Sequence, residues 1–305
     1  MLRILMHPIA SMVKRSMTKN DAKTEKGKPL PGGVTEFTDI EYIADGDRGH
    51  LLDIYAPAGR GDLPLLVDIH GGGLIYGYKE INKRFCYEMA KLGFVVANVS
   101  YRLVPAVTLP DQLRDITAAF RKLTAIAKEY GADPIEIYLT GDSAGAFLAL
   151  YAAAMTDSAA VRTAFDNEGS DVRAKGMFLV SGMYDMLAGG YMKHLCSYAL
   201  GKKYKSAPWY KYLDIRRLLG EYTPPRAFLT SSREDMLLAQ TEKYVKILDG
   251  LGLPYVYDFK EKPACVKGAP TPKIYTHVYP VRYPEWEESR DVMRRAAAYI
   301  VAADE

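Results

Sequence analysis

The residues with the clearest chemical potential are G-D-S-A-G at positions 141–145. They follow an apolar stretch at 135–140 that is typical of a strand and open an apolar stretch that is typical of a helix. A tight turn of small residues between a strand and a helix holds the central serine hydroxyl at the sheet edge, ready to act as a nucleophile. Without that context the pentapeptide would often be a simple turn. With it, we predict that Ser143 is a catalytic nucleophile, helped by the N-terminus of the following helix, which stabilises negative charge.

A second glycine-rich motif, H-G-G-G at 70–73, directly follows the apolar stretch 65–69. Attack on a carbonyl carbon requires N–H groups aimed at the oxygen as it becomes an oxyanion, and consecutive glycines let the backbone approach closely enough to supply them. We therefore predict that Gly71, Gly72 and Ala144 donate to the oxyanion. Gly72 and Gly77 have P-loop spacing, but that motif needs lysine where the chain has Tyr78, which argues against nucleotide binding.

A serine nucleophile needs a base that is oriented by an acid, in the chain order Ser, acid, His for this kind of sheet. Of the five histidines, three precede Ser143, and His194 lies in an insertion before the loop after the strand at 226–231, where the acid is expected. His277 is therefore the predicted base. His70 stands at the end of a strand, where a structural hydrogen-bonding role is expected.

The acid is expected in the loop after the strand at 226–231, which contains Glu234 and Asp235. This loop falls at the carboxyl edge of the sheet, where catalytic groups collect. Asp235 is the preferred acid and Glu234 the nearest competitor. Asp185, which follows the strand at 177–180, is a third candidate.

The elements that must position these residues alternate regularly along the chain. Helical patterns are expected at 81–92, 110–130, from 144, 237–251 and 285–302. Strands are expected at 34–43, 51–55, 64–69, 94–99, 135–140, 177–180, 226–231 and 255–259. This alternation predicts an α/β fold with a mostly parallel sheet of about eight strands, helices on both faces and ligands at the carboxyl ends of the strands. The insertion at 185–222, with helical patterns at 191–200 and 209–219, breaks the alternation and is a candidate lid.

Composition excludes several classes of protein. The chain has 305 residues, of which 49% are hydrophobic and 25% charged, so a folded domain is expected rather than a disordered or fibrous chain. A formal net charge of +3 does not indicate a nucleic-acid partner. Cys86, Cys196 and Cys265 have no metal-binding or disulfide spacing, which indicates a reducing compartment. The longest apolar run, 144–155, is too short to span a bilayer, and we expect a cytoplasmic protein without a membrane span.

Together the motifs resemble those of the hormone-sensitive-lipase-like carboxylesterases of the α/β-hydrolase fold. Y-R-L-V-P at 101–105 is similar to that family's Y-R-L-A-P segment, and the chain from Asp235 to Tyr244 fits its D-x-L-x-x-x-x-E-x-Y spacing. The resemblance favours Asp235 over Glu234 and implies a triad of Ser143, Asp235 and His277. It also implies a catalytic domain at 34–305 and a helical cap built from the arm at 1–33 and the insertion at 185–222.

The expected reaction is hydrolysis of short-chain acyl or acetyl esters. Tyr76 and Tyr78 lie just beyond the glycines, and with 23 tyrosines against nine phenylalanines we expect them to line a partly polar pocket mouth. No cofactor or metal is implied, the expected partner is a small-molecule ester, and homodimerisation is left open. Two alternatives remain: a peptidase or acyltransferase with the same triad, and a ligand-binding protein without catalysis on the same scaffold.

Overall fold

The fold is built on one eight-stranded sheet, seen in a computed structural model that describes residues 32–59, 61–188, 198–262 and 273–302, together with residues 15, 18 and 30. The strand order is β1-β2-β4-β3-β5-β6-β7-β8. β2 pairs antiparallel with β1 and β4, and every other pair is parallel. The strands are β1 (Val34–Glu41), β2 (Leu51–Pro57), β3 (Leu63–Ile69), β4 (Val95–Val99), β5 (Ala132–Asp142), β6 (Gly176–Val180), β7 (Arg226–Ser232) and β8 (Tyr255–Lys260). The predicted mostly parallel sheet of about eight strands is confirmed.

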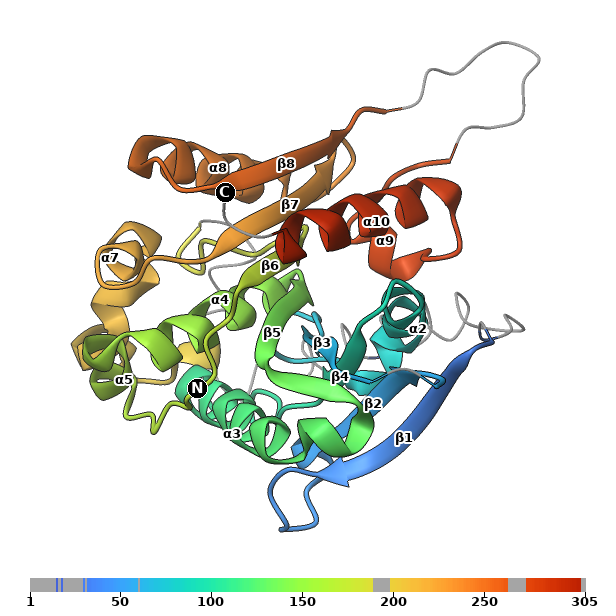
Figure 1. Ribbon diagram of the computed structural model, residues 1–305. Helices are drawn as coiled ribbons and strands as arrows, with labels where there is room; N and C mark the ends of the chain where they lie inside the picture. The colour runs from blue at the N-terminus through green and yellow to red at the C-terminus, as the bar shows by residue number, and fades with distance from the viewer. Residues whose placement is uncertain are drawn as a thin grey trace.

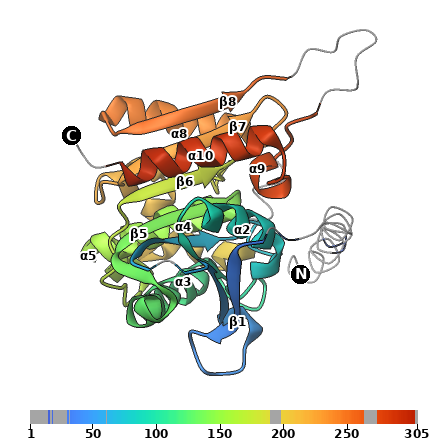
Figure 2. The same cartoon turned by 45° about the vertical axis from the view of Figure 1, so that its right-hand side comes forward.

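Helices cover both faces of the sheet (Figures 1 and 2). The α-helices are α2 (Lys83–Lys91), α3 (Leu109–Ile126), α4 (Ala144–Asp157), α5 (Ala159–Phe165), α7 (Ile215–Leu219), α8 (Leu238–Leu251), α9 (Tyr279–Arg282) and α10 (Glu287–Val301). Alternate strand side chains point to opposite faces. Leu65 and Val67 of β3 pack in the same cluster as α3, α4 and α8, whereas Leu66 packs in the cluster of α2 and α10. The two apolar clusters cover the two faces of the sheet. The carboxyl ends of the parallel strands lie at its edge, where the site is found.

Two predicted helices are interrupted. The pattern at 110–130 gives α3 and then a separate 3-10 turn, Ala127–Tyr130, which ends at Gly131 in the left-handed conformation. The pattern at 209–219 gives a 3-10 segment, Pro208–Leu213, followed by the five-residue α7, because Asp214 accepts a hydrogen bond from the Arg216 N–H and starts a new helix there. The expected helix at 191–200 and the arm at 1–33 lie mostly outside the described residues.

The core helix α4 explains the long apolar run noted in the sequence, since 13 of its 14 residues are buried. No helix in the described part of the chain is by itself long and apolar enough to cross a membrane. The pair α4 and α5 meets that test by length and composition, but the two are bent by 116°. Both belong to the core that supports β5 and the turn after it.

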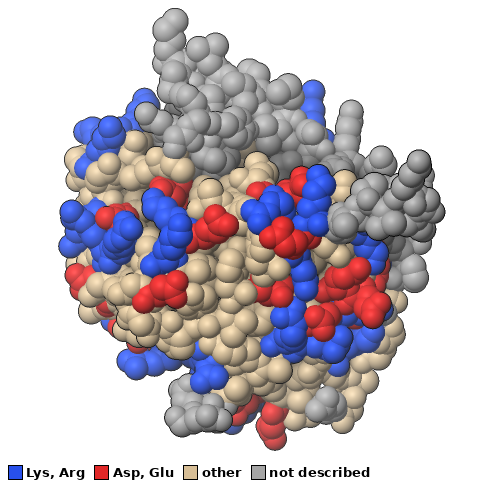
Figure 3. All heavy atoms as spheres, turned by 90° about the horizontal axis from the view of Figure 1, so that it is seen from above, with Lys and Arg blue, Asp and Glu red and all other residues tan. Residues whose placement is uncertain are grey.

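Charged side chains of both signs are interspersed on the face drawn in Figure 3. This mixture agrees with the small formal net charge of +3. The face therefore presents no field of a single sign that would favour a strongly charged partner.

Candidate active site

The turn between β5 and α4 holds Ser143 in a strained conformation. Its φ of 53° and ψ of −116° are unusual for a residue with a side chain. The Ser143 N–H donates to the Val180 carbonyl oxygen at 2.9 Å, and the Ser143 carbonyl accepts from the Met183 N–H at 2.9 Å. These bonds hold the turn and leave the partly exposed Ser143 side chain at the carboxyl edge of the sheet.

Both glycines of this turn are required by space. A Cβ on Gly141 would lie 2.6 Å from the carbonyl group of Gly145. A Cβ on Gly145 would overlap the carbonyl oxygen of Ile69, at the end of the neighbouring strand β3. The pattern G-x-S-x-G is therefore the sequence signature of a close approach between the start of α4 and β3.

Ser143, His277 and Asp235 form one hydrogen-bonded line. His277 Nε2 lies 3.0 Å from Ser143 Oγ, and His277 Nδ1 lies 2.7 Å from Asp235 Oδ1. His277 stands just before α9, and Asp235 stands between β7 and α8. The structure thus brings together the three residues predicted as nucleophile, base and acid, from three separate loops at one edge of the sheet.

The Asp235 carboxylate is fully enclosed, with no exposed side-chain surface. Its Oδ1 also accepts from the Leu237 N–H at 2.8 Å, and its Oδ2 accepts from the Ser231 hydroxyl at 2.8 Å. Burial raises the pKa of Asp235, but the hydrogen bond and charge of His277 outweigh it, and the pKa lies below its ordinary value. An ionised Asp235 can keep the proton of His277 on Nδ1, which leaves Nε2 to accept from Ser143.

The two alternative acids lie in other contacts. Glu234 forms an ion pair with Lys262 at 3.0 Å, and Asp185 forms one with Lys243 at 2.7 Å. Asp185 also accepts from the Leu187 N–H at 3.0 Å. Of the three candidates, Asp235 is the one whose carboxylate contacts the histidine.

The glycine loop after β3 differs from the prediction at one residue. The Gly71 N–H donates to Asp142 Oδ1 at 2.9 Å, so it is already engaged and is not an oxyanion donor. Gly72 is partly exposed, and its N–H has no hydrogen-bond partner among the described residues. Ala144 is the first residue of α4, where a helix N–H lacks an intrahelical acceptor. Gly72 and Ala144 therefore remain as candidate oxyanion donors.

His70 is buried and serves the loop rather than proton transfer. Its Nδ1 lies 2.7 Å from the Gly71 carbonyl oxygen, and its ring stacks on Tyr101 with ring centroids 4.3 Å apart. Burial lowers the pKa of His70 to about 4, so its ring is neutral at pH 7. The expected structural hydrogen bond is present.

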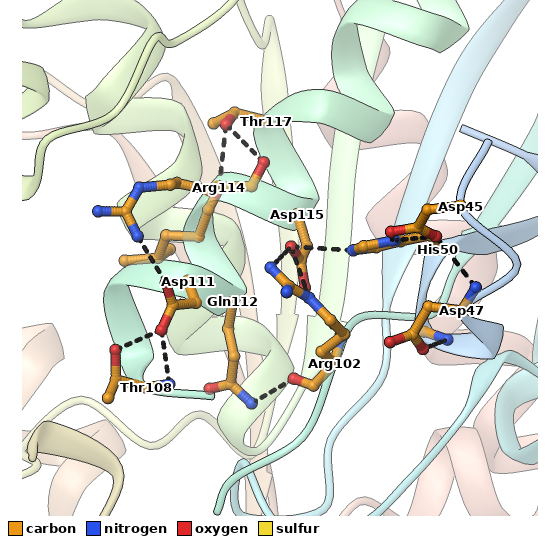
Figure 4. Close-up of polar contacts among 12 residues, drawn as sticks. Asp45, Asp47, His50, Arg102, Thr108, Asp111, Gln112, Arg114, Asp115 and Thr117 are labelled. Carbon is orange, nitrogen blue, oxygen red and sulfur yellow. Dashed lines mark hydrogen bonds and ion pairs between the residues drawn. The ribbon is translucent and has the colours of Figure 1, made fainter. Parts of the chain in front are cut away.

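Arg102 of the Y-R-L-V-P segment belongs to a polar cluster that includes residues of α3 and His50 (Figure 4). Arg102 contacts Asp115 through Nη2 at 2.6 Å and through Nε at 2.9 Å. The buried His50 joins the same carboxylate at 3.2 Å. Gln112 Nε2 donates to the carbonyl oxygens of Leu74 and Arg102, both at 2.9 Å. The cluster ties α3 to the glycine loop, and sequence reasoning did not assign His50 or Gln112 any part in it.

The two predicted substrate-binding tyrosines lie in different surroundings. Tyr76 is buried in the core, at 1% exposure, whereas Tyr78 is 42% exposed. Tyr78 borders a cavity of about 890 Å³ that Arg48, Arg102 and Pro105 also line and to which the triad residues do not contribute. Contact of either tyrosine with a substrate stays a prediction. Among the residues that the structure describes, no group of three or more His, Cys, Asp or Glu side chains is arranged to hold a metal ion.

Known proteins are similar to this chain both in sequence and in fold. The family model named BD-FAE matches residues 52–225. Versiconal hemiacetal acetate esterase of Dothistroma septosporum is 36% identical over 125 residues, which are 40% of this chain and 38% of that protein. The chain thus spans well under two thirds of the length of that curated relative.

Two solved structures share the fold. An inhibited form of esterase B from Lactobacillus rhamnosis has a TM-score of 0.88 at 24% identity, covering 97% of this chain and 96% of the other. An esterase of the bacterial hormone-sensitive lipase family has a TM-score of 0.70 at 17% identity, covering 97% and 96%. These likenesses confirm the predicted α/β-hydrolase fold. Since the family model covers more than half of the 305 residues, the chain belongs to the BD-FAE family, in agreement with its resemblance to the hormone-sensitive-lipase-like α/β-hydrolases.

Proposed function

We propose that this protein is a serine carboxylesterase that hydrolyses short-chain acyl or acetyl esters. The observation that carries the proposal is the hydrogen-bonded line from Ser143 Oγ through His277 to Asp235. Two backbone N–H groups, those of Gly72 in the loop after β3 and of Ala144 next to Ser143 in the sequence, have no acceptor among the described residues. Nucleophile, base, orienting acid and oxyanion donors are the groups that acyl transfer requires.

In the first half of the reaction, His277 Nε2 takes the proton of Ser143 as Oγ attacks the ester carbonyl carbon. The carbonyl oxygen becomes an oxyanion, which accepts hydrogen bonds from the Gly72 and Ala144 N–H groups. The C–O bond to the alcohol then breaks, and the leaving oxygen takes the proton from His277. The products are the free alcohol and an acyl group bonded to Ser143.

In the second half, His277 takes a proton from water, whose oxygen attacks the acyl carbon. The same N–H groups stabilise the second oxyanion, and its collapse returns the proton to Ser143 Oγ and releases the carboxylic acid. Asp235 remains ionised throughout and holds the Nδ1 proton, so that Nε2 faces Ser143 in both halves.

The proposed substrate class is supported by the Dothistroma relative. The name of the Dothistroma protein specifies an acetate ester. A cap formed by the arm at 1–33 and the insertion at 185–222 would close the pocket and so favour a short acyl group. Transfer to an acceptor other than water, or cleavage of an amide, would use the same groups.

A panel of p-nitrophenyl esters from acetate to palmitate, run beside an aminoacyl p-nitroanilide, tests this proposal. We expect the highest kcat/KM on the short esters and turnover of the anilide at least about a thousandfold slower. Faster cleavage of the anilide would favour a peptidase. Ester formation from added alcohols in preference to hydrolysis would favour an acyltransferase, and no turnover of any ester would favour the non-catalytic alternative.

A further inference from the structure

A row of hydrogen-bonded, buried polar side chains adjoins the turn that holds Ser143. Asp142, the residue before Ser143, accepts on Oδ1 from both the Gly71 N–H and Asn82 Nδ2, each at 2.9 Å. Asn82 Nδ2 donates its other proton to Asp68 Oδ2, also at 2.9 Å. Asp68, Asn82 and Asp142 are at most 5% exposed. One amide nitrogen therefore bridges two carboxyl groups, and one of these holds the glycine loop.

The two carboxyl groups differ in their hydrogen bonding. Asp142 Oδ1 receives two N–H donors, as expected of a carboxylate. Asp68 is fully buried, and its Oδ1 has no hydrogen-bond partner in the described structure. A buried ionised oxygen without a donor is very costly, whereas a protonated carboxyl group is not. Burial, followed by the charge of Asp142, raises the pKa of Asp68 well above its ordinary value, against the lowering effect of hydrogen bonds from Asn82 and the Cys86 thiol. Burial also raises the pKa of Asp142, but the hydrogen bonds from Asn82 and the Gly71 N–H oppose that rise.

The positions of Asp68, Asn82 and Asp142 indicate what these hydrogen bonds do. Asp68 lies on β3, two residues before His70, and Asn82 ends the 3-10 segment Lys79–Asn82 before α2. Gly71 is in contact with the Asp142 carboxylate, because a Cβ at Gly71 would meet Asp142 side-chain atoms. Movement of the Asp142 carboxylate would therefore release the Gly71 N–H and with it the backbone that presents Gly72.

We propose that Asp68, Asn82 and Asp142 act as positioning residues for the oxyanion loop, with a neutral Asp68 holding Asn82, Asn82 holding the Asp142 carboxylate, and Asp142 holding Gly71. The inference rests on the proposed esterase function. None of the three residues contacts the substrate in this scheme. They fix the direction of the Gly72 N–H, so their loss lowers kcat more than it changes KM.

Four variants test the chain of contacts. Asn82→Ala removes the bridge. Asp68→Leu removes the acceptor for Asn82 while keeping the number and branching of the side-chain heavy atoms. Asp68→Asn keeps an acceptor oxygen and the neutral state. Asn167→Ala is the matched control, since it also removes two hydrogen bonds to an asparagine, from Thr117 and from Gly169, but lies in the loop after α5.

We expect kcat on p-nitrophenyl acetate to fall about tenfold to a hundredfold in Asn82→Ala and Asp68→Leu, with KM within about threefold of the parent value. Asp68→Asn and Asn167→Ala should stay within about twofold of the parent kcat. The proposal is overturned if Asn82→Ala and Asp68→Leu also keep the parent kcat, or if Asp68→Asn is as damaged as Asp68→Leu.

Amide hydrogen exchange of a peptide that spans residues 66–76 gives a readout that does not depend on activity. The Gly71 amide should be protected in the parent protein and in Asp68→Asn, and should exchange faster in Asn82→Ala and Asp68→Leu. If the parent protein hydrolyses no ester, the proposed function fails, but the exchange pattern still decides whether the three residues hold the loop. Unchanged exchange in all four variants would refute the positioning role even in an active esterase.

Discussion

His277 Nε2 lies 3.0 Å from Ser143 Oγ, although 134 residues separate the two in the sequence. The contact exists because β5 and β8 lie in one sheet with their carboxyl ends on the same edge. Ser143 directly follows β5, whereas His277 lies at the far end of the loop after β8, just before α9. The sheet therefore assembles the site from loops that are unrelated in sequence.

Substitution of the acid should separate Asp235 from its sequence neighbours. We predict that Asp235→Asn lowers kcat by several orders of magnitude, because an amide in its place favours the wrong tautomer of His277. Glu234→Gln and Asp185→Asn should have mild effects, since these carboxylates pair with Lys262 and Lys243. The rank order of the three kcat values is the measurement. A larger loss in Glu234→Gln than in Asp235→Asn would contradict the assignment.

Because α4 approaches β3 closely, we predict that one methyl group added at Gly145 has a large effect on the stability of the protein. Gly145→Ala should destabilise the protein by about 3 kcal/mol or more, because its Cβ would overlap the Ile69 carbonyl oxygen. Gly250→Ala, inside α8, is the matched control: nothing lies within 4 Å of the added Cβ, and the change should stabilise by up to about 1 kcal/mol. Urea denaturation of both variants measures the difference. Equal stabilities would show that the packing described for the turn is wrong.

The buried His70 predicts a loss of stability in acid. Its pKa is lowered by burial from 6.5 to about 4, so between these values the unfolded chain binds a proton that the folded chain does not. The free energy of unfolding should therefore fall by about 3 kcal/mol from this residue as the pH drops from 7 to 4. His70→Asn removes the titrating group. The difference in unfolding free energy between the parent and His70→Asn should change by that amount between pH 7 and pH 4. If this difference does not depend on pH, His70 is not buried in its neutral form.

Much of the site could be predicted from the sequence because its signals are local. The turn at Ser143 is marked by small residues between a strand and a helix, and His277 is the histidine that remains once chain order is applied. The choice of Asp235 over Glu234 needed the spacing to Tyr244, since both residues lie in the same loop. Such assignments depend on a few neighbouring positions.

What the sequence did not reveal are contacts between elements. The engagement of Gly71 by Asp142 depends on the pairing of β3 with β5, which places Ile69 opposite Gly141. Asp68 gave one usable signal, since it is a carboxyl group inside the apolar strand Leu63–Ile69 and a buried acid needs a hydrogen-bond partner. Its partner could not be named without the register of the strands.

The cap gives a prediction about chain length. If the arm at 1–33 and the insertion at 185–222 close the carboxyl edge into a finite pocket, each added methylene contributes roughly 0.8 kcal/mol while it fits and then becomes unfavourable. We expect kcat/KM to peak between acetyl and hexanoyl esters and to fall steeply beyond them. Deletion of residues 1–33 should reduce activity although it removes no triad residue. Rising activity out to palmitoyl esters, or a truncated enzyme with full activity and the same profile, would refute the cap.

The central claim is that Ser143 is the nucleophile of an ester hydrolase, and the kcat of Ser143→Ala on p-nitrophenyl acetate tests it most directly. The variant should fold as the parent does, because alanine only removes the hydroxyl from a residue whose backbone is held by Val180 and Met183. We predict a loss of kcat on the order of a thousandfold or more, as for other triad nucleophiles. Turnover within about tenfold of the parent rate by a correctly folded Ser143→Ala variant would contradict the account.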